Sequence, residues 1–232
     1  MPAIDSSEIR SLPLFAEVED GHFDALVGAA LLERFPPRAI LAEEGKQADF
    51  LHVLLDGSVE LFGEMDEQQT TITVLRPVTA FILPAVVAGL PCLASARTIN
   101  PAHILMIQAD AVRSVFGADP AFARAIVCEL SRSFRRLLGN LKNHKLRTST
   151  ERLADWLLRA NAQLGERGRF TLPFDKRTLA SRLGMTPENL SRNLKALSGC
   201  GVVIHGRDVT LNDPAGLAGI ARGAHAGDEA EF

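Results

Sequence analysis

The residue types with the clearest chemistry lie near the carboxyl end, where Ser191 and Arg192 follow Glu188 by three and four positions. On a helix this spacing places all three side chains on one face within a turn and a half. An arginine can pair with O6 and N7 of guanine, a glutamate can accept from N4 of cytosine, and a serine can serve a base or a phosphate. The spacing therefore predicts a face that reads base edges in double-stranded DNA. The alternative is that Glu188 only favours the helix N-terminus and pairs with Arg192.

The segment that must position these residues has the pattern of a helix-turn-helix at 178–197. Gly184 separates two helical stretches, and Thr186-Pro187 supplies an N-cap followed by proline at the first helical position. The buried side of both stretches is predicted to consist of Leu179, Ala180, Leu183, Met185, Leu190, Leu194 and Leu197. Residues 202–211 then predict two strands around a turn at Gly206, which together would form a wing.

The charge distribution favours contact with a polyanion. The 232-residue chain has a net charge of −3, but residues 1–144 contain 12 basic and 18 acidic residues, whereas residues 145–212 contain 12 basic and 6 acidic residues. A positive segment on an otherwise acidic chain is typical of phosphate binding with counterion release. The alternative is an ordinary solvated surface. The candidate phosphate contacts are Lys176, Arg177, Arg182, Lys195 and Arg207.

Residues 35–107 consist of short apolar runs separated by turn signals, which predicts a β-barrel or jelly roll. Asp56-Gly57 lies between two alternating runs and predicts a hairpin, because both turn positions need a positive φ. The first thirty residues predict a small helical segment in front of the strands.

After Asp119-Pro120, apolar residues recur at spacings of three and four over about twenty residues, which predicts a long amphipathic helix. Basic side chains occupy its other face, so an apolar stripe remains for a partner helix. The predicted dimer seam consists of Ile126, Leu130, Phe134, Leu137, Leu138 and Leu141. The alternative is that the stripe packs on the chain's own barrel. A capping-box pattern, Thr148-x-x-Glu151, predicts a second helix and a hinge at 143–148.

These elements predict an α+β protein with two globular domains joined by a helix. The expected segments are a sensor β jelly-roll domain at 1–118, a dimerisation helix at 119–144, a winged helix-turn-helix at 145–215 and a flexible tail at 216–232.

Several classes of protein are not expected. The N-terminus lacks a signal-peptide pattern and no uncharged apolar run reaches about eighteen residues, so a cytoplasmic protein without a membrane partner is predicted. Cys92, Cys128 and Cys200 are far apart, which argues against a disulfide framework or a metal site. Neither a nucleophile–base pair nor a P-loop occurs, so an enzyme is not predicted.

The barrel, the long helix and the winged helix-turn-helix together resemble the Crp/Fnr superfamily over residues 8–212. In its Fnr branch the recognition helix carries Glu-x-x-Ser-Arg, which Glu188, Ser191 and Arg192 match. The Crp branch has arginine before the glutamate and glycine in the serine position, so Pro187 and Ser191 agree with the Fnr branch. The resemblance implies a homodimeric transcription regulator that reads an inverted repeat resembling TTGAT-N4-ATCAA, with Arg192 on the guanine and Glu188 across the pair. It also implies RNA polymerase as a partner.

The sensor domain departs from the cyclic-nucleotide-binding relatives where they hold the ligand. In those relatives a Gly-Glu-Leu turn binds phosphate and ribose, and a later Arg-Ser or Arg-Thr pair neutralises the phosphate. Here Leu83 and Pro84 occupy the Gly-Glu positions and Ala94-Ser95 the Arg-Ser positions, and proline removes a backbone donor. Cyclic AMP is therefore not the expected ligand, since Arg97 could replace the missing arginine only after a shift of three residues along its strand.

The effector is not identified by the sequence. The apolar stretch 81–87 could line a pocket for a hydrophobic effector or haem, or could fill the core. The candidate pocket residues are Phe81, Ile82, Leu83, Pro84, Ser95 and Arg97. Haem would need an axial ligand, for which His22, His52 and His103 are the candidates. An iron–sulfur cluster is not expected, because the N-terminal cysteine cluster of Fnr is missing.

Overall fold

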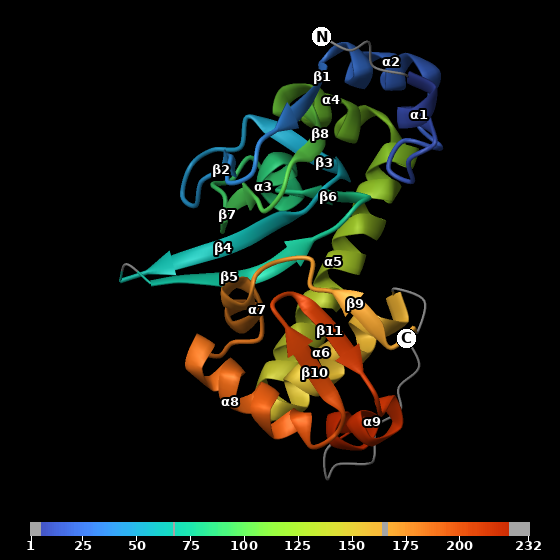
Figure 1. The fold of residues 1–232 in the computed structure, drawn as a ribbon. Helices are drawn as coiled ribbons and strands as arrows, with labels where there is room; N and C mark the ends of the chain where they lie inside the picture. Colours follow the sequence, from blue (N-terminus) through green and yellow to red (C-terminus); the bar gives the residue numbers. More distant parts are fainter. Residues whose placement is uncertain (1–5, 67, 164–166, 223–232) are drawn as a thin grey trace. The chain divides into compact units, whose positions relative to one another are not determined.

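The computed structural model describes residues 6–66, 68–163 and 167–222, and the chain divides into two compact units, Met1–Arg136 and Leu137–Phe232 (Figure 1). Most strands belong to the first unit, and the second is mainly helical. This mixture confirms the predicted α+β class. Within the described residues, no helix combines the length and apolar character needed to cross a membrane.

Two four-stranded antiparallel sheets form the first unit. One has the order β1-β8-β3-β6, made of Ala30–Phe35, Ala102–Gln108, Phe50–Asp56 and Thr79–Phe81. The other has the order β2-β7-β4-β5, made of Ile40–Ala42, Ser95–Thr98, Val59–Met65 and Gln68–Leu75. Leu54 and Ile104 of the first sheet share one buried cluster with Val59 and Ala96 of the second. The sheets therefore pack face to face, which confirms the predicted jelly-roll type of domain.

The predicted hairpin at Asp56-Gly57 is wrong. β3, which ends at Asp56, pairs with β6 and β8, whereas β4 pairs with β5 and β7. The turn therefore carries the chain from one sheet to the other. Glycine is still required there, because Gly57 has a φ of +91° and a Cβ atom would lie 2.5 Å from the carbonyl oxygen of Pro101.

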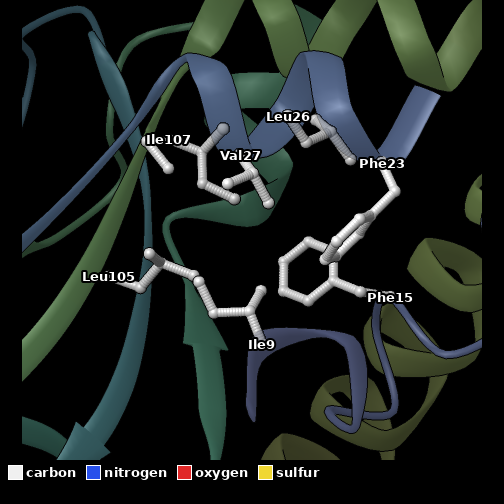
Figure 2. Close-up of a pocket in the computed structure, with 8 residues that line it drawn as sticks. Ile9, Phe15, Phe23, Leu26, Val27, Leu105 and Ile107 are labelled. Carbon is white, nitrogen blue, oxygen red and sulfur yellow. The ribbon is translucent and has the colours of Figure 1, made fainter. Parts of the chain in front are cut away.

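Helices cover the outer face of the first sheet. The main contributors are α1 (Ser6–Arg10), α2 (Asp20–Gly28), α3 (Leu83–Ala88) and α4 (Ala109–Ala118). Strand alternation sorts the side chains of β3, since Leu51 and Val53 pack with the helices while Leu54 faces the second sheet. Figure 2 shows this helix–sheet contact, made by the hydrocarbon side chains of Ile9, Phe15, Phe23, Leu26, Val27, Leu105 and Ile107.

The long helix predicted after Asp119 is α5, which runs from Pro120 to Leu146 and passes from the first unit into the second. It is followed by α6 (Ser149–Gln163). The capping box at the start of α6 is confirmed, because Glu151 N–H donates to Oγ1 of Thr148 at 3.3 Å and Thr148 N–H donates to Oε2 of Glu151 at 2.8 Å. The break between the helices falls within the predicted hinge.

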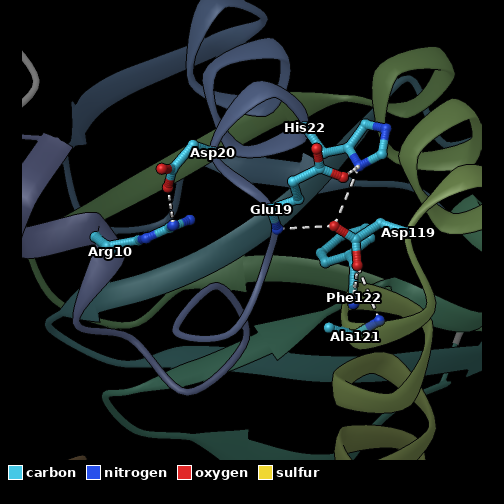
Figure 3. A network of polar contacts seen from close by, with 7 residues as sticks. All are labelled: Arg10, Glu19, Asp20, His22, Asp119, Ala121 and Phe122. Atoms are coloured by element: carbon cyan, nitrogen blue, oxygen red, sulfur yellow. Dashed lines mark hydrogen bonds and ion pairs between the residues drawn. The ribbon is translucent and has the colours of Figure 1, made fainter.

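The buried carboxylate of Asp119 caps the start of α5 (Figure 3). Its Oδ1 accepts from the backbone N–H groups of Phe122 at 2.9 Å and Ala121 at 2.8 Å, and its Oδ2 accepts from Glu19 N–H at 2.9 Å. Nδ1 of His22 lies 3.2 Å from the same Oδ2. These hydrogen bonds, that of Phe122 first, lower the pKa of Asp119. The side chain thereby ties the start of α2 to the start of α5.

The second unit packs helices on a small sheet of order β10-β11-β9. Its elements after α6 are β9 (Arg169–Thr171), α7 (Lys176–Arg182), α8 (Pro187–Ser198), β10 (Val202–His205), β11 (Asp208–Leu211) and α9 (Pro214–Arg222). β10 and β11 pair antiparallel around Gly206, whose φ is +61°, as the wing prediction required. The third strand, β9, was not predicted from the sequence.

The flexible tail predicted from residue 216 is wrong for residues 216–222. These residues belong to α9, which packs on α6 and buries Leu217 and Ala221. The second unit therefore extends beyond residue 215, because an apolar helical face closes its core after the wing. The rest of the predicted tail, residues 223–232, lies outside the described residues.

Candidate nucleic-acid interface

The turn between α7 and α8 is built as its residue types predict. Asp175 caps α7 by accepting from Thr178 N–H at 2.7 Å, and Thr186 caps α8 by accepting from Asn189 N–H at 3.2 Å. Gly184 between them has a φ of +60°. The helix-turn-helix prediction at 178–197 is confirmed.

One face of α8 is buried in the second unit through Leu190, Asn193 and Leu197. Asn193 accepts from Oγ1 of Thr150 at 3.0 Å, and its amide nitrogen lies 3.5 Å from the sulfur of Met185. Sequence reasoning missed Asn193, because a polar residue inside an apolar pattern looks like a surface position. This hydrogen bond to α6 orients α8 about its own axis.

Glu188, Ser191 and Arg192 lie on the exposed face of α8, away from its buried residues. The Ser191 hydroxyl donates to the carbonyl of Pro187 at 2.9 Å, so its oxygen lone pairs point outward as acceptors. Hydrogen bonds from its own backbone N–H and from Thr186, and then the charge of Arg192, lower the pKa of Glu188. The carboxylate is therefore ionised and accepts hydrogen bonds at neutral pH.

The basic residues near this face differ in their exposure and in their side-chain contacts. Lys176, Arg177 and Lys195 are exposed. Arg182 is half-buried, with its guanidinium 5.8 Å from the ring centre of Phe174. The Arg207 guanidinium donates to the carbonyl of Leu172 at 3.0 Å and 2.5 Å, which holds the wing to the segment before α7.

Of the six residues predicted to form the apolar stripe of α5, only the last four are exposed. Phe134, Leu137, Leu138 and Leu141 are between 47% and 67% exposed. The assignment of Ile126 to the seam is wrong, because this residue is 0% exposed in the core of the first unit, and Leu130 is partly buried against the same core. Val127, which is 55% exposed, was missed. The available signal was its seven-residue spacing to Phe134, which is repeated from Phe134 to Leu141.

The candidate effector residues do not gather around one space. Phe81 belongs to the buried cluster between the two sheets, and Leu83 to the one under the helices. Pro84 is exposed, and Ile82 turns the chain with a φ of +62°. This stretch therefore fills the two cores. Ser95 Oγ accepts from Glu44 N–H at 3.0 Å, outside that stretch.

Arg97 lies on the opposite face of β7 from Ala96, whose side chain is in the cluster between the sheets. Its Nε donates to Oε2 of Glu60 at 2.7 Å, and its guanidinium lies 4.1 Å from the ring centre of Phe62. The charge of Arg97 is therefore paired with Glu60 on the face of β7 away from the cluster between the sheets.

The three candidate axial histidines lie in different surroundings. His52 is buried and stacks on Phe81 at 5.1 Å between ring centres; burial lowers its pKa to about 4, so the imidazole is neutral. His22 contacts Asp119, and His103 is half-buried in β8. Phe81, on which His52 stacks, belongs with Leu54 to the buried cluster between the two sheets.

Glu19, His22 and Asp119 are the one group of potential metal ligands found within the described residues, with ligand atoms within 4.8 Å of one another. Both oxygens of Asp119 already accept backbone hydrogen bonds that hold two helices. Helix capping explains this arrangement, so we assign no metal site to these three residues.

Comparison with known families agrees with the two units. The family model for the cyclic nucleotide-binding domain matches residues 32–119, and the model for the Crp-like helix-turn-helix domain matches residues 151–220. No curated protein matches the chain.

Solved structures share the fold over most of the chain. FixK2 from Bradyrhizobium japonicum has a TM-score of 0.72 and 20% identity, with 82% of this chain and 96% of that chain covered. A regulator assigned to the Crp/Fnr family from Eubacterium rectale has a TM-score of 0.77 and 15% identity, covering 91% and 98%. A protein of Silicibacter pomeroyi described as a cAMP-binding regulatory protein has a TM-score of 0.60 and 26% identity, covering 93% and 97%.

Proposed function

This chain belongs to the Crp/Fnr superfamily of DNA-binding transcription regulators and is not an enzyme, and on that premise we propose that it acts as a homodimer that reads an inverted repeat under the control of an effector other than cyclic AMP. The observation that carries the proposal is the exposed face of α8, where Glu188, Ser191 and Arg192 stand together beside exposed basic residues. We place the protein in the cytoplasm, where its DNA target is.

The proposed target is an inverted repeat resembling TTGAT-N4-ATCAA. Arg192 pairs with O6 and N7 of the guanine, and Glu188 accepts from N4 of the cytosine across the pair. Ser191 adds an acceptor for a neighbouring exocyclic amine, because its own proton is donated to Pro187. Lys176, Arg177 and Lys195 then contact phosphates and supply affinity that is independent of sequence.

The proposed dimer forms along α5. Val127, Phe134 and Leu141 recur every seven residues and expose a stripe that also includes Leu137 and Leu138. Such spacing suits a second copy of the same helix, because a seven-residue repeat keeps one seam in contact between two helices. A two-fold axis at this seam explains why the target is an inverted repeat.

The proposed effector is not a cyclic nucleotide. Leu83 and Pro84 replace the phosphate-binding turn, Ala94 replaces the arginine, and Arg97 is paired with Glu60. We further propose that the DNA-bound dimer contacts RNA polymerase, as a transcription regulator of this superfamily.

The full chain is expected to prefer the inverted repeat strongly. Fluorescence anisotropy at one fixed salt concentration compares a duplex carrying TTGAT-N4-ATCAA with a scrambled duplex of equal composition. Affinity for the repeat should be higher by roughly 10³-fold, the lower end of specific over non-specific binding. Equal affinities for the two duplexes would show that α8 does not read this sequence.

Cyclic AMP and cyclic GMP are expected to leave the melting temperature of the protein unchanged. The reason is that the chain lacks the carboxylate and the arginine that would hold ribose and phosphate. Thermal unfolding is followed during titration with each nucleotide, and the inverted-repeat duplex serves as the ligand that must raise the melting temperature. Stabilisation by micromolar nucleotide would overturn the assignment of a different effector.

A further inference from the structure

The turn of the helix-turn-helix is held by a side chain from α6. Nε of Arg152 donates to the carbonyl of Leu183 at 3.0 Å, and its Nη2 lies 3.4 Å from the carbonyl of Gly184. Its Nη1 donates to the carbonyl of Arg147, directly after α5, at 2.7 Å. One guanidinium thus joins the carbonyl ends of α5 and α7.

A second side chain reaches the same turn from the last turn of α5. A Cβ atom on Gly184 would lie 2.5 Å from Cε1 and 2.8 Å from Nδ1 of His144, so the imidazole packs directly on the glycine backbone. The ring also hydrogen-bonds the carbonyl of Arg182. Gly184 therefore meets two requirements, a positive φ and the absence of a side chain.

Both contacts act close to the recognition helix. Thr186, the N-cap of α8, is two residues beyond Gly184, and Glu188 is four residues beyond it. The carbonyl ends of α5 and α7 carry partial negative charge, and the positive charge of the one Arg152 guanidinium stabilises both ends. A displacement of the end of α5 would therefore be transmitted to the start of α8 through the side chains of Arg152 and His144.

We propose that Arg152 and His144 form a lock that fixes α8 to the end of α5 in the DNA-binding position, and that protonation of His144 opens it. The lock is a positioning device for base reading, and it rests on the proposed function. Neither residue contacts DNA in this proposal.

The charges around His144 predict how the contribution of the lock changes with pH. His144 is exposed on one side, and its contact with the Gly184 backbone desolvates the ring only in part. This partial desolvation first, and the charge of Arg152 second, lower the pKa of His144 below 6.5, while the hydrogen bond to the Arg182 carbonyl opposes this. The folded state therefore prefers neutral His144. The contribution of the lock is complete above pH 6.5 and is lost as the pH falls through the lowered pKa.

The other charged side chains on the elements around His144 have contacts of their own. On α6, the Glu151 carboxylate accepts from Thr148 N–H, and Asp155 pairs with Arg147 and Arg159. On α7, the Arg182 guanidinium lies over Phe174, and on α5 Lys145 is exposed. Arg152 is thus the cation that a protonated His144 would oppose.

The test of Arg152 measures the ratio of affinity for the inverted repeat to affinity for the scrambled duplex, with the full chain at pH 7.5. R152Q is expected to lower this ratio roughly fivefold, and R152K to restore part of it. The matched control R159Q removes an exposed arginine of the same helix that pairs only with Asp155 among the described contacts, and should keep the wild-type ratio. An unchanged ratio in R152Q would overturn the lock.

The test of His144 measures the same ratio between pH 5.5 and 8, which cancels the general gain in DNA affinity at low pH. The wild-type ratio should fall below pH 6.5, H144Q should flatten the profile, and H144R should show the low ratio at every pH. H22Q, in the first unit, should retain the wild-type slope.

A profile in H144Q that equals the wild type would overturn the pH-sensitive lock. This readout remains decisive even if R152Q proves unstable in thermal unfolding. Failure of the proposed function can be told apart from failure of the lock, because the wild type would then show no preference for the repeat at any pH.

Discussion

Replacing Leu137 and Leu141 together by arginine is expected to produce a monomer that no longer binds the inverted repeat tightly. Both side chains are about half exposed on the apolar stripe of α5, so the change should leave the core of each unit intact. Two charges in the seam cannot be buried between two copies of the helix. Light scattering should give a mass near 25.1 kDa. Affinity for the repeat should fall by roughly 100-fold or more, since a monomer can no longer bind both half-sites at once.

The matched control places two arginines elsewhere on the same helix. Cys128 and Gly139 are exposed, and both lie off the stripe marked by Val127, Phe134 and Leu141. The C128R/G139R double variant changes the net charge equally and should remain a dimer with wild-type affinity. A dimeric L137R/L141R protein would place the interface on another surface.

The helix-turn-helix could be predicted residue by residue because its signals are local. Gly184 ends one helix, and Thr186-Pro187 starts the next within three positions. The capping box of Thr148 and Glu151 is equally local. In each case the residues that carry the signal are the same residues that make the hydrogen bonds.

Errors arose where the sequence signal is local but the structure depends on distant partners. Asp56-Gly57 indicates a turn, yet the pairing of the flanking strands depends on β6, β8, β5 and β7. Ile126 and Val127 are adjacent and both apolar, but one step along a helix rotates the side chain by about 100°. One therefore packs in its own core and the other is exposed.

The candidate site could be predicted only as far as the faces of single elements. Alternation along β7 decides that Ala96 points inward and Arg97 outward, but the direction depends on which sheet covers the strand. The lock of His144 and Arg152 had no sequence signal, because its contacts are to backbone carbonyls that any residue supplies.

Arg192→Ala is expected to remove discrimination at one base pair in each half of the repeat. A bidentate arginine–guanine pair contributes about 1–3 kcal/mol of discrimination, and a two-fold symmetric dimer makes this contact twice. The preference for guanine should therefore fall by about 2–6 kcal/mol over the whole repeat. Anisotropy measurements on duplexes with each base pair changed in turn give the result, because only the substitutions at the guanine should lose their penalty.

Lys195→Ala is the control, since Lys195 is an exposed cation on the same helix that we assign to a phosphate. It should weaken binding to every duplex alike and reduce the slope of affinity against salt by about one contact per subunit, while base preference is retained. If Arg192→Ala kept the full penalty for changing the guanine, Arg192 would not be the residue that reads it. The two variants together separate a guanidinium that reads a base from a lysine ammonium that only adds positive charge.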